Sequence, residues 1–145
     1  MDNYRLTKEN LKDLVEFAKD NNFSSKFDKD FAKNFVNGSK INSPRTQTYG
    51  IYIGKELAAI ATATFSYIFP NEYSKNGKTV YISNLYTLEK YRNRGIATIL
   101  LKAIETDAIN FGADTMFCEA TLPLFLQKHM FINTSYEEKR MWKKL

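Results

Sequence analysis

The hydrophobic pattern of the chain predicts four helices. In three segments, apolar residues recur every three to four positions, which is the period of a helix with one buried face. The first segment begins after Thr7, a residue type that caps helix N-termini, the second covers residues 25–37 and stops at Gly38, and the third ends near Gly112. A short helix fits residues 123–130. The apolar positions of the three longer helices are Leu11, Leu14, Val15 and Ala18; Phe27, Phe31 and Phe35; and Ile96, Ile99, Leu100, Ala103, Ile104 and Ala108.

Runs rich in β-branched and aromatic residues predict strands between these helices. Strands are expected over residues 4–6, 48–53, 57–68, 79–88, 115–121, 131–136 and 138–145. Residues 54–56 join two of them as an antiparallel hairpin, and in the last strand Met141 and Leu145 face one side while Trp142 faces the other. The order is strand, two helices, three antiparallel strands, helix, strand, helix and two strands. This is an α/β arrangement without repeats or linkers.

Size and composition fit a single folded domain. The chain has 145 residues, of which 43% are hydrophobic and 26% charged, so we expect one domain over residues 1–145 with a substantial core. No apolar run approaches the roughly 20 residues of a membrane span, and the N-terminal residues lack the layout of a signal peptide. The single cysteine, Cys118, suits a reducing compartment. We therefore expect a cytoplasmic protein without membrane association.

The charge balance favours anionic partners. The formal net charge is +5 and the isoelectric point is near 9.2. A phosphorylated small molecule and a nucleic acid would both be attracted, but the chain contains no recognised nucleic-acid motif. It also contains no phosphate loop of the Gly-x-x-x-x-Gly-Lys type and no Cys/His cluster for zinc. We expect no nucleic-acid partner and no metal.

The most informative pattern lies in residues 81–101. An apolar strand ends there, a turn with Arg92, Arg94 and Gly95 follows, and an amphipathic helix begins. The first N–H groups of a helix have no partner within the helix and lie at the positive end of its dipole, so a glycine turn before a helix favours a phosphate. The alternative is an ordinary strand-to-helix turn with solvated arginines, since the spacing alone is a weak signal.

Arg92, Gly95 and Ala97 match the pattern Arg/Gln-x-x-Gly-x-Gly/Ala. The segment resembles the acetyl-CoA motif of the GCN5-related N-acetyltransferases (GNAT family), most strongly over residues 80–112. The resemblance implies the acyl-CoA N-acyltransferase fold, with a mixed, mostly antiparallel central sheet and helices on both faces. It also implies that the strands expected over 79–88 and 115–121 splay apart to expose backbone groups to the ligand.

The same resemblance implies an enzyme that transfers an acetyl group from acetyl-CoA to a primary amine by direct attack. Backbone groups near Leu85 would face the pantetheine, and the amides that follow Arg92 would face the pyrophosphate. The residues expected to bind acetyl-CoA are Leu85, Tyr86, Thr87, Arg92, Asn93, Arg94, Gly95, Ile96, Ala97 and Thr98. Homodimers are usual in the family, and the acceptor site is expected near the first two helices and the loop after the third strand.

Acetyl transfer to an amine needs a neutral nucleophile, but an amine with a pKa near 10.4 is mostly protonated at physiological pH. Glu119 and Glu72 are candidate bases, and the alternative for each is a solvated carboxylate. The family implies that a backbone N–H near Tyr86 or Thr87 stabilises the negative charge on the thioester oxygen.

The chain departs from the family at the group that protonates the leaving sulfur. Many relatives carry a tyrosine on the short helix after the fifth strand, but here Phe125 or Leu126 occupies that position and neither can donate a proton. The enzyme could work without a dedicated acid, since a thiol with a pKa near 8.5 leaves as thiolate. His129, Tyr86 or Tyr136 could replace it. Otherwise the protein is a weak or inactive module that senses acyl-CoA. The acceptor and the length of the acyl group stay open.

Overall fold

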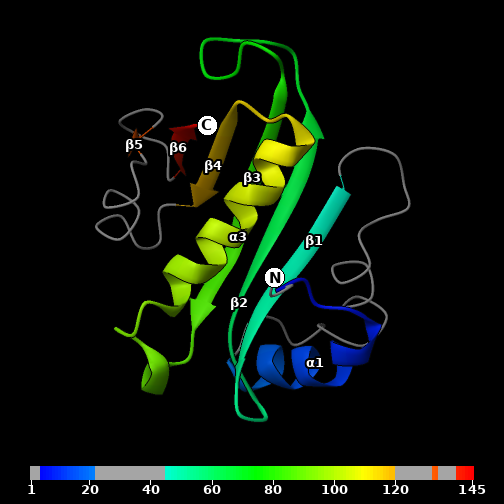
Figure 1. Ribbon diagram of the computed structural model, residues 1–145, viewed down its shortest axis with the longest axis vertical. Helices are drawn as coiled ribbons and strands as arrows, with labels where there is room; N and C mark the ends of the chain where they lie inside the picture. Colours follow the sequence, from blue (N-terminus) through cyan, green and yellow to red (C-terminus); the bar gives the residue numbers. More distant parts are fainter. Residues whose placement is uncertain (1–3, 22–44, 120–131, 134–139) are drawn as a thin grey trace.

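A computed structural model of the protein describes residues 4–21, 45–119, 132–133 and 140–145 (Figure 1). Its elements are η1 (Lys8–Asn10), α1 (Leu11–Asp20), β1 (Arg45–Ile53), β2 (Glu56–Tyr67), β3 (Lys78–Thr87), η2 (Glu89–Tyr91), α3 (Ile96–Phe111), β4 (Thr115–Glu119), β5 (Ile132–Asn133) and β6 (Arg140–Lys144). The helices predicted over 25–37 and 123–130 lie outside the described residues. Of the helices within them, none is long and apolar enough to cross a membrane.

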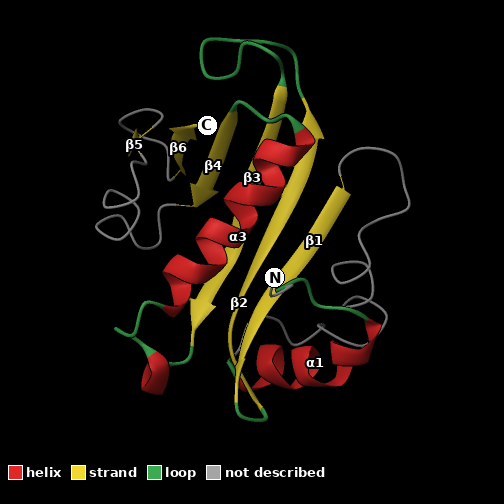
Figure 2. Ribbon diagram, in the orientation of Figure 1, coloured by secondary structure: helices red, strands yellow, loops and turns green. Residues whose placement is uncertain are grey.

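The strands form one six-stranded sheet in the order β1-β2-β3-β4-β6-β5 (Figure 2). All neighbours are antiparallel except β3 and β4, which are parallel and connected through α3. The predicted mixed, mostly antiparallel sheet is therefore confirmed. The strand predicted over 4–6 is present only as a bridge between Arg5 and Tyr49 at the outer edge of β1.

The sheet has an apolar core on each face because side chains alternate along β2. Ala59 and Ala61 face a core to which α3 contributes Leu100 and Ile104, and all four side chains are almost fully buried. Ile60, between the two alanines, faces the other side and packs in a smaller core with residues of α1. The small alanine side chains let α3 lie close to the sheet, across the face visible in Figure 1.

The ends of the helices follow their local sequence. Thr7 and Asn10 form a reciprocal capping box at the start of η1, which leads directly into α1. Gly112 ends α3 in the left-handed conformation, at φ 91°, and its N–H donates to the carbonyls of Ala108 and Ile109. Both the capping role of Thr7 and the end of the long helix near Gly112 are confirmed.

Both predicted hairpins are confirmed. β1 and β2 join through a turn at Gly54 and Lys55, and β5 and β6 pair antiparallel. In β6, Met141 is fully buried in the α3-side core, whereas Trp142 stacks edge-on against Tyr73 at 5.4 Å on the opposite face. The alternation predicted for the last strand is therefore present, and β6 extends the sheet beyond β4.

Candidate functional site

Strands β3 and β4 part halfway along β3. Their parallel pairing runs from Thr79 opposite Thr115 to Ile82 opposite Cys118. β3 continues to Thr87, pairing only with β2 on its other edge, and no strand among the described residues pairs with this half of β3 on the β4 side. Backbone polar groups along such an edge require partners, so the edge is suited to an extended polar ligand.

A β-bulge marks the place where the strands part. Thr62 is opposite Ser83 and Ile60 is opposite Tyr86, so two residues of β3, Asn84 and Leu85, stand against one residue of β2. Asn84 adopts a φ of 54°, a left-handed conformation that asparagine tolerates better than most residues. The extra residue shifts the alternation of β3. As a result, Tyr86 turns toward the core beside α1.

The turn after β3 leads into the N-terminus of α3. Asn93 and Gly95 adopt positive φ values of 64° and 78°, and α3 begins at Ile96. No side chain caps this N-terminus, and the first turn of the helix contains no acidic residue. A Cβ built on Gly95 would meet no atom within 4 Å, so the space next to the turn is open. The N–H groups of the first helical turn and the helix dipole therefore favour an anion at this position.

The two arginines of the turn lie against tyrosine rings. The Arg92 guanidinium is 5.2 Å from the centre of the Tyr86 ring, and its Nε donates to the Thr87 carbonyl at 2.9 Å. Arg94 lies 5.6 Å from the centre of the Tyr91 ring. Cation–π contacts of this kind restrict where a guanidinium can point. Arg92 is therefore bonded to the last residue of β3, and Arg94 lies in the turn.

Glu56 connects the turn to the β1–β2 hairpin. It accepts a hydrogen bond from the Tyr91 hydroxyl at 2.7 Å and pairs with the Lys90 ammonium at 2.6 Å. The Lys90 and Tyr91 hydrogen bonds lower the pKa of the Glu56 carboxyl, and Glu56 raises the pKa of both partners. Because these groups are exposed, the contacts serve mainly to fix the position of η2 before the turn.

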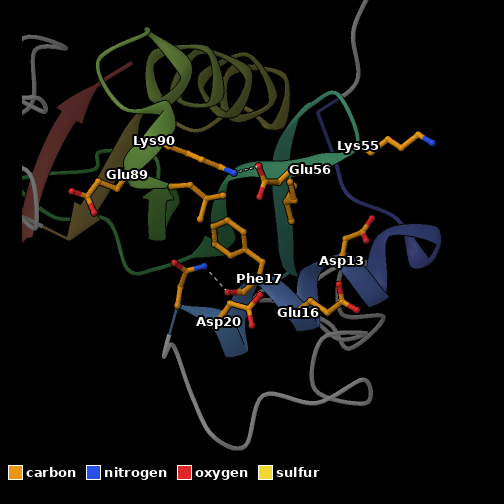
Figure 3. A pocket seen from close by; sticks show the side chains of 11 residues that line it. Asp13, Glu16, Phe17, Asp20, Lys55, Glu56, Glu89 and Lys90 are labelled. Atoms are coloured by element: carbon orange, nitrogen blue, oxygen red, sulfur yellow. Dashed lines mark hydrogen bonds and ion pairs between the residues drawn. The ribbon is translucent and has the colours of Figure 1, made fainter.

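A hollow of about 800 Å³ opens beside this contact (Figure 3). It lies between α1, the β1–β2 turn and the end of β3, and Phe17, Leu57 and Leu88 give it an apolar part. The other residues that line it are Asp13, Glu16, Asp20, Asn21, Lys55, Glu56, Glu89 and Lys90. Its size is that of a small-molecule site.

Phe17 and Tyr86 link the hollow to the strand end. Their rings meet edge-on at 5.8 Å, and the side chain of Phe17 is 5% exposed. On the hairpin side, the Tyr52 hydroxyl donates to Asp13 at 2.6 Å. Partial burial and this hydrogen bond raise the pKa of Tyr52 to about 12, so its hydroxyl stays protonated at physiological pH. The walls of the hollow are therefore joined by direct contacts.

Comparison with known proteins identifies the family of this chain. A sequence model of the acetyltransferase (GNAT) family matches residues 8–131. The chain belongs to the GNAT acetyltransferase family. No curated protein sequence matches the chain.

Solved structures share the GNAT fold with this chain. A predicted acetyltransferase from Clostridium acetobutylicum, solved with acetyl-CoA, is 21% identical over 92% of this chain and 90% of its own, with a TM-score of 0.71. NAA60 from Arabidopsis thaliana with acetyl-CoA is 17% identical over 97% and 96% of the two chains, with a TM-score of 0.70. A GNAT acetyltransferase from Streptococcus pneumoniae is 15% identical over 97% of each chain, with a TM-score of 0.72.

The residues expected to bind acetyl-CoA, Tyr86 among them, lie together, but the candidate bases Glu72 and Glu119 lie on separate segments. The residues expected to bind acetyl-CoA occupy one continuous stretch, from the end of β3 through the turn to the first turn of α3. Glu72 lies in the β2–β3 loop, at the opposite end of the ten-residue β3, which spans about 30 Å at 3.3 Å per residue. Glu119 is the last residue of β4, one position beyond the last pair with β3.

Two of the three candidate proton donors, His129 and Tyr136, lie outside the described residues. So do Phe125 and Leu126, which occupy the position of the usual tyrosine. Tyr86 is described, and its ring packs between Phe17 and the Arg92 guanidinium.

The acidic residues of the hollow were not among the candidates predicted from sequence. Asp13, Glu16 and Asp20 recur at helical spacing on α1, and this spacing was the available signal. That they line one hollow together with Glu56 of the hairpin depends on tertiary packing, which local patterns do not predict.

Proposed function

We propose that the protein transfers the acetyl group of acetyl-CoA to a primary amine by direct attack within a ternary complex. The observation that carries the proposal is the parting of β3 from β4 immediately before an uncapped helix N-terminus. It combines a strand edge that β4 does not follow with an anion site, and only residues 88–95 separate the two. Acetyl-CoA has the matching parts, an extended amide-containing arm followed by a pyrophosphate.

The N–H groups from Gly95 to Thr98 are suited to hold the pyrophosphate, and Arg94 adds charge beside them. Arg92 lies against the end of β3 and can turn toward a phosphate by giving up its bond to the Thr87 carbonyl. The amides of the pantetheine arm would take the strand positions that β4 leaves unpaired beyond Ile82.

The chemical step forms one bond and breaks one. The neutral amine nitrogen attacks the thioester carbonyl carbon, the C–N bond forms, and the C–S bond then breaks with coenzyme A leaving as thiolate. A backbone N–H near Tyr86 or Thr87 would stabilise the negative oxygen of the intermediate. The proton lost by the amine passes to a base or to water, and Glu119 and Glu72 are the candidate bases.

A second function is favoured by the sequence at residues 125–131. Phe125 or Leu126 replaces the tyrosine that many relatives use as the acid for the sulfur, and losing such an acid costs roughly 10²-fold in rate. A protein with the same fold that binds acyl-CoA but does not turn it over would fit this replacement. Turnover therefore has to be measured separately from binding.

A paired measurement on the purified protein tests both functions. We expect acetyl-CoA at one hundred times its dissociation constant to add about 2.7 kcal/mol to the free energy of unfolding, which a thermal shift detects. We also expect release of free thiol from acetyl-CoA when a panel of primary amines is added. A thermal shift without thiol release on any amine would favour the acyl-CoA sensor. No thermal shift would contradict both functions.

A further inference from the structure

The last residue of β3 presents its carbonyl to the edge that β4 does not follow. In an antiparallel pair of strands, opposite residues that bond to each other alternate with opposite residues whose N–H and C=O groups point outward. The Leu88 N–H donates to the Ala58 carbonyl at 2.8 Å, so these two residues form a bonded pair. Thr87, one residue earlier, is opposite Ala59 and belongs to the outward kind. The Thr87 carbonyl therefore faces away from β2, toward the place proposed for the pantetheine arm.

The side chain of Arg92 occupies this place. Its Nε donates to the Thr87 carbonyl at 2.9 Å, and its guanidinium lies 5.2 Å from the centre of the Tyr86 ring, on the preceding residue of the strand. A ligand amide that bonded to Thr87 as a neighbouring strand does would need the position that Nε holds. Arg92 therefore closes the strand edge at the end next to the turn.

The backbone at Arg92 is held by the elements around it. The Arg92 N–H donates to the Glu89 carbonyl at 3.2 Å, at the end of η2. The next residue toward the strand, Tyr91, is bonded to Glu56 of the β1–β2 hairpin. In contrast, the Arg92 side chain is exposed, and an exposed hydrogen bond and cation–π contact hold it only weakly. Arg92 can therefore exchange partners by rotating its side chain while its backbone stays in place.

Arg92 lies between the two parts of the proposed donor site. It comes five residues after Thr87, which ends the strand edge, and three residues before Gly95, which precedes the N-terminus of α3. A phosphate carries a full negative charge, so it attracts a guanidinium more strongly than a neutral carbonyl does. A pyrophosphate at the start of α3 would draw Arg92 away from Thr87 and leave the edge open to the amides of the same ligand.

We propose that Arg92 selects the acyl donor by closing the strand edge in the free protein and opening it for a thioester that carries a phosphate. The proposal rests on the acetyl transfer proposed above and adds the residue that determines donor specificity. The side chain has two positions, one on the Thr87 carbonyl and one on the phosphate, and a ligand shifts it by binding the second more tightly. An acyl pantetheine without phosphates makes no such contact, so it binds only the fraction of molecules that is already open.

The test measures the dissociation constants of acetyl-CoA and acetyl-pantetheine, by titration calorimetry and, for weak binding, by ligand-observed NMR. Arg92→Met removes the charge and the donor at Thr87 and keeps an apolar chain near Tyr86. It should bind acetyl-pantetheine about tenfold more tightly than the unchanged protein, because one hydrogen bond and one cation–π contact no longer keep the edge closed. It should bind acetyl-CoA several-fold more weakly, because the phosphate contact is lost.

Arg94→Met is the matched comparison. It removes a charge from the same turn, but Arg94 lies on the Tyr91 ring and leaves the bond between Arg92 and Thr87 in place. We expect Arg94→Met to weaken acetyl-CoA binding and to leave acetyl-pantetheine binding as it is. Changes of opposite sign for the two ligands are therefore expected only in Arg92→Met.

The Nε–H resonance of Arg92 adds a readout that a merely structural role would not move. It is assigned by its absence in Arg92→Met, and it should shift when acetyl-CoA binds, because the acceptor changes from a carbonyl to a phosphate. Equal or weaker binding of acetyl-pantetheine by Arg92→Met, or a resonance that acetyl-CoA leaves in place, would overturn selection by Arg92 and leave the acetyl-CoA site intact. If the unchanged protein showed no thermal shift with acetyl-CoA, the proposed function would be overturned instead.

Discussion

Replacing Gly95 with leucine tests whether the turn before α3 is the acetyl-CoA site. Gly95 has a φ of 78°, and a Cβ built on it meets no atom within 4 Å. Leucine there is strained only through its backbone, by about 1–2 kcal/mol, and the lower entropy of the unfolded chain offsets roughly 0.4–1 kcal/mol of this. We therefore expect a folded protein with a melting temperature only a few degrees lower.

Gly54 provides a matched control for this substitution. It has a φ of 62°, and a Cβ added to it would likewise meet no atom within 4 Å, but it lies in the β1–β2 turn rather than before α3. Gly54→Leu should therefore lose a similar amount of stability for the same reason. Any difference in ligand binding between the two variants then reports on the position of the glycine and not on backbone strain.

Binding of acetyl-CoA should distinguish the two variants clearly. A leucine side chain at Gly95 would occupy the open space in front of the first N–H groups of α3. Loss of two hydrogen bonds to a charged phosphate, at about 1.5–3 kcal/mol each, raises the dissociation constant at least 100-fold. Titration calorimetry measures this directly. If Gly95→Leu bound acetyl-CoA with nearly the affinity of Gly54→Leu, the pyrophosphate would have to lie elsewhere.

Most of the fold could be predicted from the sequence because its signals are local. Gly95 and Gly112 bracket α3, Thr7 caps the first helix, and the alternation around Trp142 sets the faces of β6. The separation of β3 from β4 was expected only from the resemblance to the GNAT family. It depends on where β4 stops following β3, at Cys118, and no periodicity within either strand reveals that point.

The candidate site was only partly predictable for the same reason. The motif residues are consecutive, so their placement at the strand end and helix start followed from the sequence. The bulge at Asn84 had one weak signal, an asparagine inside a strand, and it decides that Tyr86 faces α1. The hollow joins α1 to the hairpin through Asp13 and Glu56, which are far apart in the sequence. Such contacts follow from packing of the whole chain.

Three further variants test the charge, packing and pH dependence of the fold and site. Arg94→Gln should weaken acetyl-CoA binding about tenfold and reduce its salt dependence, and unchanged affinity over a salt titration would remove Arg94 from the site. Ile104→Ala, at a fully buried position of α3, should lower the free energy of unfolding in urea by about 2–5 kcal/mol, and a smaller loss would mean that the core collapses around the gap. Asp107 is partly buried, which by itself raises its pKa, but hydrogen bonds from Arg5 at 2.7 Å and 2.9 Å and from Tyr49 at 2.7 Å bring the pKa below the ordinary value. Because the folded pKa is the lower one, the unfolded chain binds the proton more readily, so this stabilisation is present above about pH 4 and is lost as the pH falls through the folded value. Asp107→Asn should therefore lower the melting temperature at pH 7 and reduce its decline between about pH 5 and 3, and a decline as steep as in the unchanged protein would assign acid unfolding to other carboxylates.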